Sequence, residues 1–262
     1  MSDTTDMSGS QPPDETLDHL SAMIDGANNI AFFTGAGIST ESGIPDFRSP
    51  GTGLWNKMKP IDFEEFLSSE SARDEYWRRR FTGERSMQNA LPNNGHKAVA
   101  KLVLAGKANA VITQNVDNLH QDSGVPEDQT IELHGNNSYA VCLSCGTRVE
   151  FAALEQQFRN QAHIDPCGRC GGIIKSATIS FGQAMPERAM HRAQAATEAC
   201  DTMIVVGSSL LVYPAAGFPE YAKRIGARLI IVNREPTPLD DLADLVVHAE
   251  IGPTLSHAVG IN

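Results

Sequence analysis

The stretch Ile30-Ala31-Phe32-Phe33-Thr34-Gly35-Ala36-Gly37 decides the fold class. Four apolar residues in a row are typical of a strand that is covered on both faces of its sheet. The glycine pair directly after them predicts a tight turn. Free backbone amides at such a turn can cradle a phosphate, although a purely structural turn explains the two glycines equally well.

The turn is not the dinucleotide fingerprint of hydride-transferring dehydrogenases. In the pattern Gly-x-Gly-x-x-Gly the sixth position is glycine, and here it is Thr40. The acidic residue expected about 20 positions further on is also missing, because Lys57 stands there. A dehydrogenase is therefore disfavoured.

The same alternation of short apolar runs and helical patterns continues outward from this stretch. Helices are predicted from Asp14, as the N-cap, to about residue 27, and over residues 96–105, 186–199 and 215–225. Further strands are predicted over residues 110–112, 203–206, 229–232 and 245–247. This alternation predicts an α/β fold with a doubly wound, Rossmann-like parallel sheet, whose ligand lies at the carboxyl ends of the strands.

Two stretches interrupt the alternation and set the expected domains. Residues 43–95 show helical segments without a clear strand, and residues 138–176 hold four of the five cysteines. We expect a disordered tail over 1–13 and a Rossmann-like domain over 14–137 and 177–262, with a helical insertion at about 43–95. Residues 138–176 are expected to form a smaller, inserted zinc-binding module.

The composition narrows the class of protein. The 262 residues carry 21 basic and 32 acidic side chains, a net charge of −11. This charge argues against direct nucleic-acid binding, and it favours either a basic protein partner or solubility alone. No apolar run approaches the roughly 20 residues of a membrane span, and the polar N-terminus lacks the pattern of a secretory signal. We expect a cytoplasmic protein without membrane association.

The cysteines form two matched pairs. Cys142 and Cys145 make one Cys-x-x-Cys pair, and Cys167 and Cys170 make the other after 21 intervening residues. Two such knuckles predict one closed tetrahedral zinc site with four thiolate ligands, which leaves no position for catalytic water. A redox pair or a free-standing DNA-binding ribbon is less consistent with two matched pairs inside an acidic α/β protein. Cys200 is expected to be a buried bystander.

Six blocks in order carry a resemblance to a known family. Gly35–Ser39 followed by Gly43-Ile44-Pro45-Asp46-Phe47-Arg48 is similar to the signature of the sirtuins, the Sir2-type NAD-dependent protein-lysine deacylases. The other blocks are Thr113-Gln114-Asn115-Val116-Asp117, His134-Gly135, the two cysteine pairs, Gly207-Ser208-Ser209-Leu210 and Asn233-Arg234-Glu235. The resemblance covers roughly residues 16–255.

The resemblance implies an NAD site. The residues that would bind NAD are Gly35, Ala36, Gly37, Ile38, Ser39, Asp46, Phe47, Arg48, Gln114, Asn115, Val116, Asp117, Gly207, Ser208, Ser209, Asn233, Arg234 and Glu235. The glycine turn would line the pyrophosphate, which Arg48 would also meet. Asp117 would hold the nicotinamide carboxamide, and Asn115 would bind the ribose and order water.

The resemblance also implies a mechanism in which NAD is consumed. The acyl oxygen of a modified lysine attacks the ribose as nicotinamide leaves. The resemblance implies His134 and Asn115 as the two catalytic residues. His134 would be the base that deprotonates a ribose hydroxyl, since imidazole titrates near working pH. The products are free lysine and O-acyl-ADP-ribose, and the expected partners are proteins that contain acylated lysine.

The resemblance places the substrate peptide along Ile179, Phe181 and Gly182, where it would add a strand. Two positions depart from the usual pattern, because Ser176 stands where proline is common and Gln183 where an acid is common. Peptide preference is therefore open, while the chemistry is not affected.

The preferred acyl group is a separate question. Tyr76 and Arg79 fit the Tyr-x-x-Arg of sirtuins that prefer succinyl- or malonyl-lysine, but Arg79 is also one of three consecutive arginines that would suit a solvated helix face. The leading prediction is a deacetylase. The alternatives are a desuccinylase or demalonylase that uses this pair, a mono-ADP-ribosyltransferase, and a non-catalytic binding module.

Overall fold

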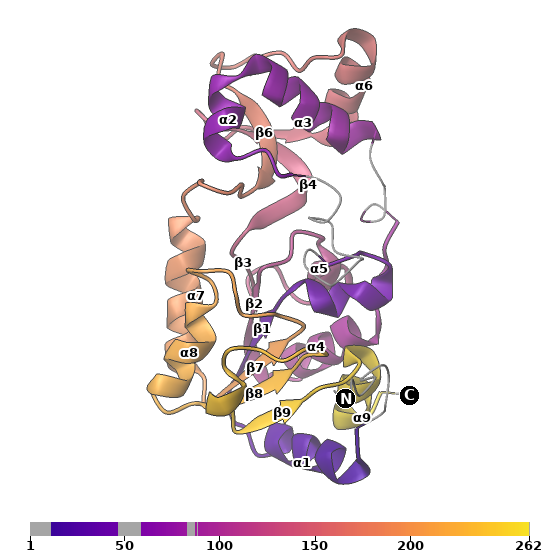
Figure 1. Cartoon of the computed structure of the whole chain (residues 1–262), viewed down its shortest axis with the longest axis vertical. Coiled ribbons are helices and arrows are strands. Elements are labelled where there is room, and N and C mark those ends of the chain that lie inside the picture. Colours follow the sequence, from indigo (N-terminus) through magenta and orange to yellow (C-terminus); the bar gives the residue numbers. More distant parts are fainter. Residues whose placement is uncertain (1–11, 47–58, 83–86, 88, 262) are drawn as a thin grey trace, which may run out of the picture.

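The computed structural model describes residues 12–46, 59–82, 87 and 89–261, and it contains two sheets (Figure 1). The larger sheet has six parallel strands in the order β3-β2-β1-β7-β8-β9, and the smaller has three antiparallel strands in the order β5-β4-β6. The doubly wound α/β class with a smaller inserted domain is confirmed. Among the described residues, no helix is long and apolar enough to cross a membrane.

The six-stranded sheet is buried on both faces. Its strands are β1 (Ile30–Thr34), β2 (Ala108–Thr113), β3 (Thr130–Glu132), β7 (Thr202–Val206), β8 (Arg228–Val232) and β9 (Leu245–Val247). Every residue of β1 and β7 is buried. Burial on both faces explains why these strands are continuous apolar runs rather than alternating ones.

Helices cover each face of this sheet (Figure 1). The helices of this domain are α1 (Asp14–Asp25), the 3₁₀ helix η1 (Ala36–Ser42), α4 (Asn94–Leu104), α5 (Leu119–Asp122), α7 (Glu187–Ala199), α8 (Gly217–Arg224), the 3₁₀ helix η4 (Asp240–Leu242) and α9 (Ile251–Val259). One core lies under α1, α4 and α9, and a second core lies under α7 and α8.

The two sequence interruptions come together as one small domain. It contains β4 (Gly135–Cys142), β5 (Arg148–Glu150) and β6 (Ile174–Thr178), with α2 (Phe63–Ser68), α3 (Glu70–Thr82) and α6 (Phe151–Gln161). Trp77 of α3 is 1% exposed and shares a core with Ala140 of β4 and Leu154 of α6. The helical insertion and the cysteine module are therefore joined by packing, although residues 96–137 separate them along the chain.

The ends of several helices differ from the sequence-based expectation. Asp14 was expected to be an N-cap, but it is the first residue of α1, because Pro13 has the extended backbone (ψ 142°) that a capping position needs. Pro186 is likewise the N-cap of α7 rather than its first residue. Helix α9 was not predicted, because its apolar face becomes apparent only from its contacts with α1 and α4.

Candidate active site

The glycine turn after β1 packs directly against the turn after β7. The amide of Gly37 donates to the carbonyl of Gly207 at 2.8 Å. A Cβ at Gly35 would lie 2.7 Å from that carbonyl oxygen, and a Cβ at Gly207 would lie 2.3 Å from the amide nitrogen of Ile38. Gly207 also has φ +63°. The glycines are therefore required by a close approach of two backbones at the carboxyl edge of the sheet.

A hydrogen-bonded polar cluster lies beside this turn. Ser39, in η1, donates through Oγ to the Asp117 carboxylate at 2.6 Å. Asn115 follows β2, and its Nδ2 donates to the Gly35 carbonyl at 3.1 Å and to Ser39 Oγ at 3.2 Å. Burial raises the pKa of Asp117, although hydrogen bonds from Ser39 and from the Leu119 amide oppose this shift. The carboxylate is thus held in one orientation near the glycine turn.

Two buried histidines support this cluster, and the sequence predicts a role for neither. His96 Nε2 lies 3.5 Å from Ser39 Oγ, and its ring contacts that of His120 edge-on, with 5.1 Å between centroids. Burial lowers the pKa of His96 to about 4, and burial together with the neighbouring His96 lowers the pKa of His120 well below its usual range. Both rings are therefore neutral at physiological pH. Only their contacts, that of His96 with Ser39 and that of His120 with Thr34, identify them, because nothing in the local sequence marks either one.

The threonines at the ends of β1 and β2 connect His120 to the loop that carries Asn115. Thr34 Oγ1 donates to Thr113 Oγ1 at 2.8 Å, and it lies 2.9 Å from His120 Nε2. Because the single hydroxyl proton of Thr34 goes to Thr113, the ring nitrogen of His120 is the donor to Thr34. Thr113 Oγ1 then accepts from the Asn115 amide at 3.0 Å. This chain fixes the backbone that carries Asn115.

His134 follows β3 and lies at the same edge of the sheet. Its Nδ1 is 3.0 Å from the carbonyl oxygen of Gln114. A carbonyl can only accept, so Nδ1 carries the proton and the neutral ring has its lone pair on Nε2. This is the tautomer that a base acting through Nε2 needs, with the ring orientation set by a backbone group.

The expected peptide segment begins next to His134. The Ile179 amide donates to the His134 carbonyl at 2.8 Å. Gly135 pairs with Thr178 of β6, and its φ is +74°; a Cβ there would lie 1.9 Å from the Ala177 carbonyl oxygen. Phe181 is 49% exposed. The chain beyond β6 thus leads from the histidine to the surface.

The remaining expected NAD residues extend along the carboxyl edge of the sheet. Gln114 Nε2 donates to Ser208 Oγ at 2.8 Å, which links the ends of β2 and β7. Asn233, after β8, is 9% exposed and donates to the Glu235 carbonyl at 2.6 Å. Arg234 pairs at the surface with Glu235 and with Glu250, at 3.9 and 3.7 Å. Ala36, Ile38, Val116 and Ser209 follow strands of this sheet, and Asp46 lies in the chain beyond η1, whereas Phe47 and Arg48 lie outside the described residues.

Tyr76 and Arg79 of α3 have different partners. The Tyr76 hydroxyl bonds to Ser176 Oγ of β6. Arg79 Nε donates to Glu75 at 2.6 Å, and its Nη1 donates to the Lys59 carbonyl at 2.8 Å. The guanidinium is therefore already paired with a carboxylate of its own helix.

The four cysteines converge as the sequence predicts. The sulfurs of Cys142, Cys145, Cys167 and Cys170 all lie within 4.8 Å of one another. Cys142 and Cys170 are 3.5 Å apart, and Cys145 and Cys167 are 3.8 Å apart. Four thiolates at about 2.3 Å from one zinc would be about 3.8 Å apart, so the geometry fits one structural, tetrahedral zinc and not a disulfide.

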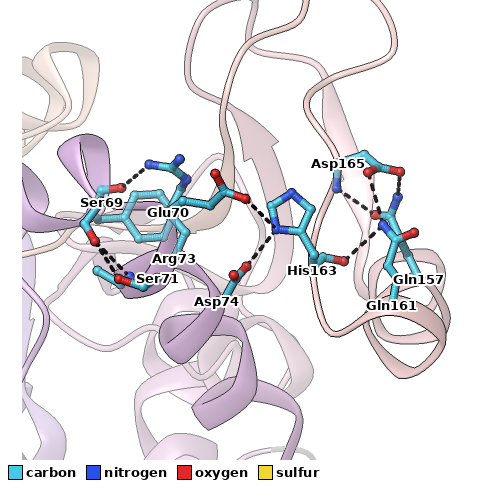
Figure 2. Close-up of polar contacts among 11 residues, drawn as sticks. Ser69, Glu70, Ser71, Arg73, Asp74, Gln157, Gln161, His163 and Asp165 are labelled. Atoms are coloured by element: carbon cyan, nitrogen blue, oxygen red, sulfur yellow. Dashed lines mark hydrogen bonds and ion pairs between the residues drawn. The ribbon is translucent and has the colours of Figure 1, made fainter.

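A second group of acidic and imidazole side chains joins α3 to the chain after α6 (Figure 2). His163 Nδ1 lies 2.8 Å from an Asp74 carboxylate oxygen and 3.8 Å from a Glu70 oxygen. All three side chains are partly or fully exposed. We interpret them as an ion pair that fastens the helical insertion to the cysteine module.

Comparison with known proteins agrees with this geometry. The model of the Sir2 family matches residues 35–214. An NAD-dependent protein deacetylase of Rhodopseudomonas palustris is 53% identical over 244 residues, which cover 93% of this chain and 96% of the relative. NAD-dependent protein deacetylase 1 of Bradyrhizobium diazoefficiens is 54% identical over 244 residues, which cover 93% of this chain and 95% of the relative.

Solved structures agree over the whole domain arrangement. A structure of Sir2 with a p53 peptide and NAD⁺ matches with a TM-score of 0.84 at 34% identity, covering 94% of this chain and 99% of that chain. A Sir2 variant with a deacetylated p53 peptide and 3′-O-acetyl ADP ribose matches with a TM-score of 0.85 at 34% identity, covering 94% and 98%.

Proposed function

The chain belongs to the Sir2 family and is an NAD-dependent protein deacetylase that produces O-acetyl-ADP-ribose, and from this premise we propose a role for each part of the site. When bound, NAD would supply the ribose hydroxyl that accepts the acyl group and the nicotinamide that leaves. Because Gly35 and Gly37 carry no side chains, their turn lets the pyrophosphate lie close to the backbone, while the amides of both glycines are bonded to the Val206 and Gly207 carbonyls. Ser208, Asn233 and Glu235 contact the adenosine half at the far end of the same edge.

The nicotinamide half is held by the cluster around Asp117. Its buried carboxylate, fixed by Ser39, accepts from the carboxamide, and Asn115 binds the ribose and orders water. The neutral side chains of His96 and His120 support this cluster through their contacts with Ser39 and Thr34. Because the supporting groups are already bonded to one another, little reorganisation is needed when the ligand enters.

His134 is the general base. The single observation that carries this role is the hydrogen bond from its Nδ1 to the Gln114 carbonyl, because it puts the lone pair of the neutral ring on Nε2, the atom that would take a proton from a ribose hydroxyl. The peptide adds as a strand along Ile179–Gly182, so the acyl-lysine enters beside His134. Acetylated peptides are bound in related structures, and we propose proteins with acylated lysine as the substrates here.

We favour acetyl over succinyl or malonyl as the acyl group. The guanidinium that would bind an acyl carboxylate, that of Arg79, is paired with Glu75. A cytoplasmic location is proposed because four free thiolates in a zinc site suit a reducing compartment. Nucleic acid is not proposed as a partner, since the net charge is −11.

The test replaces His134 with alanine. An acetylated peptide is incubated with NAD, and mass spectrometry follows the peptide, nicotinamide and O-acetyl-ADP-ribose. We expect deacetylation to fall by roughly 10² to 10⁴, the usual cost of losing a general base, while NAD still raises the melting temperature. The matched control is His191→Ala, an exposed histidine of α7, which should keep wild-type turnover.

Two outcomes contradict the proposal. Near-normal turnover in His134→Ala would assign the base to another residue. A mass gain of ADP-ribose on a peptide that carries no acyl group, without deacetylation of the acetylated peptide, would favour the mono-ADP-ribosyltransferase instead.

A further inference from the structure

A pocket of about 600 Å³ lies where the chain after β6 passes α2. We call it the α2 groove, and its walls are Asp62, Phe63, Glu64 and Leu67 on one side and Phe181 and Gly182 on the other. The Phe63 amide donates to the Phe181 carbonyl at 2.9 Å, which fixes the two walls relative to each other.

The walls of the α2 groove combine apolar surface with negative charge. Leu67 is 41% exposed and Phe181 is 49% exposed, although both are large apolar side chains. Asp62 accepts from the Glu65 amide through one oxygen, and no donor among the described residues bonds to its other oxygen. Among the described residues, no cation pairs with the Glu64 carboxylate.

The groove continues the segment proposed to bind the peptide. Ile179 is bonded to His134, and Phe181, two residues further, forms a wall of the groove. Strand β6 ends at Thr178, and two residues of fully extended chain span at most about 7 Å, so the two positions lie no more than roughly 7 Å apart. A peptide added along this segment with its acyl-lysine at His134 would place a side chain about two or three positions away over the groove.

We propose that the α2 groove is a substrate subsite that selects a lysine or arginine flanking the acyl-lysine. Such a side chain has an aliphatic stem and a cationic head. The stem packs against Leu67 and Phe181, and the head lies between the carboxylates of Asp62 and Glu64. The net charge of −11 draws the same basic peptides toward the protein. The inference rests on the proposed peptide site and specifies the substrate class for it.

The test is a peptide panel with a charge reversal. Peptides with one acetyl-lysine carry either arginine or glutamate at each position from four before to four after it. Turnover and, separately, affinity by fluorescence anisotropy are measured for wild type, Glu64→Gln and Glu64→Lys. The matched control is Glu220→Lys, an exposed acid of α8 outside the groove.

In the wild type, we expect kcat/KM to be about two- to fivefold higher for the arginine peptide than for the glutamate peptide at one or two flanking positions. The difference should arise mainly from KM, and it should be smaller at high salt. Glu64→Gln should reduce the preference, Glu64→Lys should reverse it at the same positions, and Glu220→Lys should retain it. Unchanged melting temperatures would show that the variants are folded.

Equal use of arginine and glutamate peptides by the wild type would overturn the subsite. The same shift in Glu64→Lys and Glu220→Lys would also overturn it, because the effect would then be one of total charge. Failure of the proposed function is distinguishable, since no acetylated peptide would be turned over. The anisotropy measurement would still decide the subsite in that case.

Discussion

Gly207 is a residue at which a single methyl group tests the geometry of the proposed NAD site. A Cβ there would lie 2.3 Å from the Ile38 amide nitrogen, and φ is +63°. We expect Gly207→Ala to lower the free energy of unfolding by about 1–3 kcal/mol, as overpacking does, and to raise the KM for NAD because the β1 turn must move. Urea unfolding and steady-state kinetics measure the two effects.

Gly217→Ala is the matched control for Gly207→Ala. A Cβ at Gly217 would meet no heavy atom within 4 Å, and this residue begins α8. Its substitution should change neither the stability nor the KM for NAD appreciably. If Gly207→Ala behaved like Gly217→Ala, the close approach of the two turns would not constrain the site.

The glycines also show what the sequence can reveal at the residue scale. The pair Gly35 and Gly37 predicts a turn because it follows an apolar strand. The sequence cannot show why alanine would not serve, since the backbone that excludes a Cβ belongs to Gly207, about 170 positions away. His96 and His120 were missed for the same reason, because their role depends on contacts with Ser39 and Thr34.

Burial of His96 predicts a specific dependence of stability on pH. Its pKa is about 4 in the folded protein and about 6.5 in the unfolded chain, so the unfolded chain binds the proton first as the pH falls. The contribution of neutral His96 to the stability of the folded protein is complete above pH 6.5. As the pH falls from 6.5 to 4 this contribution is lost, and the free energy of unfolding decreases by up to about 3 kcal/mol. His96→Gln should therefore flatten the decline of unfolding free energy over this range, measured by urea denaturation.

The exposed His191 provides the comparison for this measurement. His191→Gln should leave the wild-type decline unchanged, because its ring is in water in both states. Identical slopes for wild type and His96→Gln would contradict the assignment of a neutral, buried His96 to the folded protein.

At the scale of elements, α3 shows the limit of reading a helix from its sequence. The helical pattern predicted a helix over part of this region, and α3 runs from Glu70 to Thr82. The pattern also predicted Tyr76 and Arg79 on one helical face, since they are three residues apart. It could not show that Arg79 pairs with Glu75 of the same helix and that Tyr76 bonds to Ser176 of β6.

These contacts lead to a prediction for Arg79→Met. Arg79 is one-third exposed and its charge is offset by Glu75, so we expect acetyl- and succinyl-peptide turnover to change by less than about twofold. Both peptides are assayed by mass spectrometry on both proteins, with Arg188→Met on α7 as a control for loss of a surface charge. A selective collapse of desuccinylation would instead establish Arg79 as the group that binds an acyl carboxylate.

At the scale of the whole molecule, the protein has a large sheet domain and a small domain with separate cores (Figure 1). The order of strands and helices predicted the large domain, because each element is local and the connections of parallel strands follow a general rule. The three-stranded sheet was not predicted. Its strands are short, and β4 and β6 are brought together across the cysteine module by contacts far apart in sequence.

Separate cores predict that loss of the zinc site will unfold one domain and leave the other intact. Cys167 is a proposed ligand and is 5% exposed within the small core. In Cys167→Ala the metal's contribution to folding is lost, so amides of β4 and β6 should exchange rapidly with deuterium. Amides of β1 and β7 should stay protected, since these strands belong to the two cores of the large domain. Deacetylation should be lost, because the β4–β6 pairing supports the segment bonded to His134.

Cys200→Ala, which removes a buried cysteine outside the zinc site, should retain one zinc and protection in both domains. Full metal content and normal protection in Cys167→Ala would contradict the four-thiolate site, and uniform loss of protection would contradict the independence of the two cores.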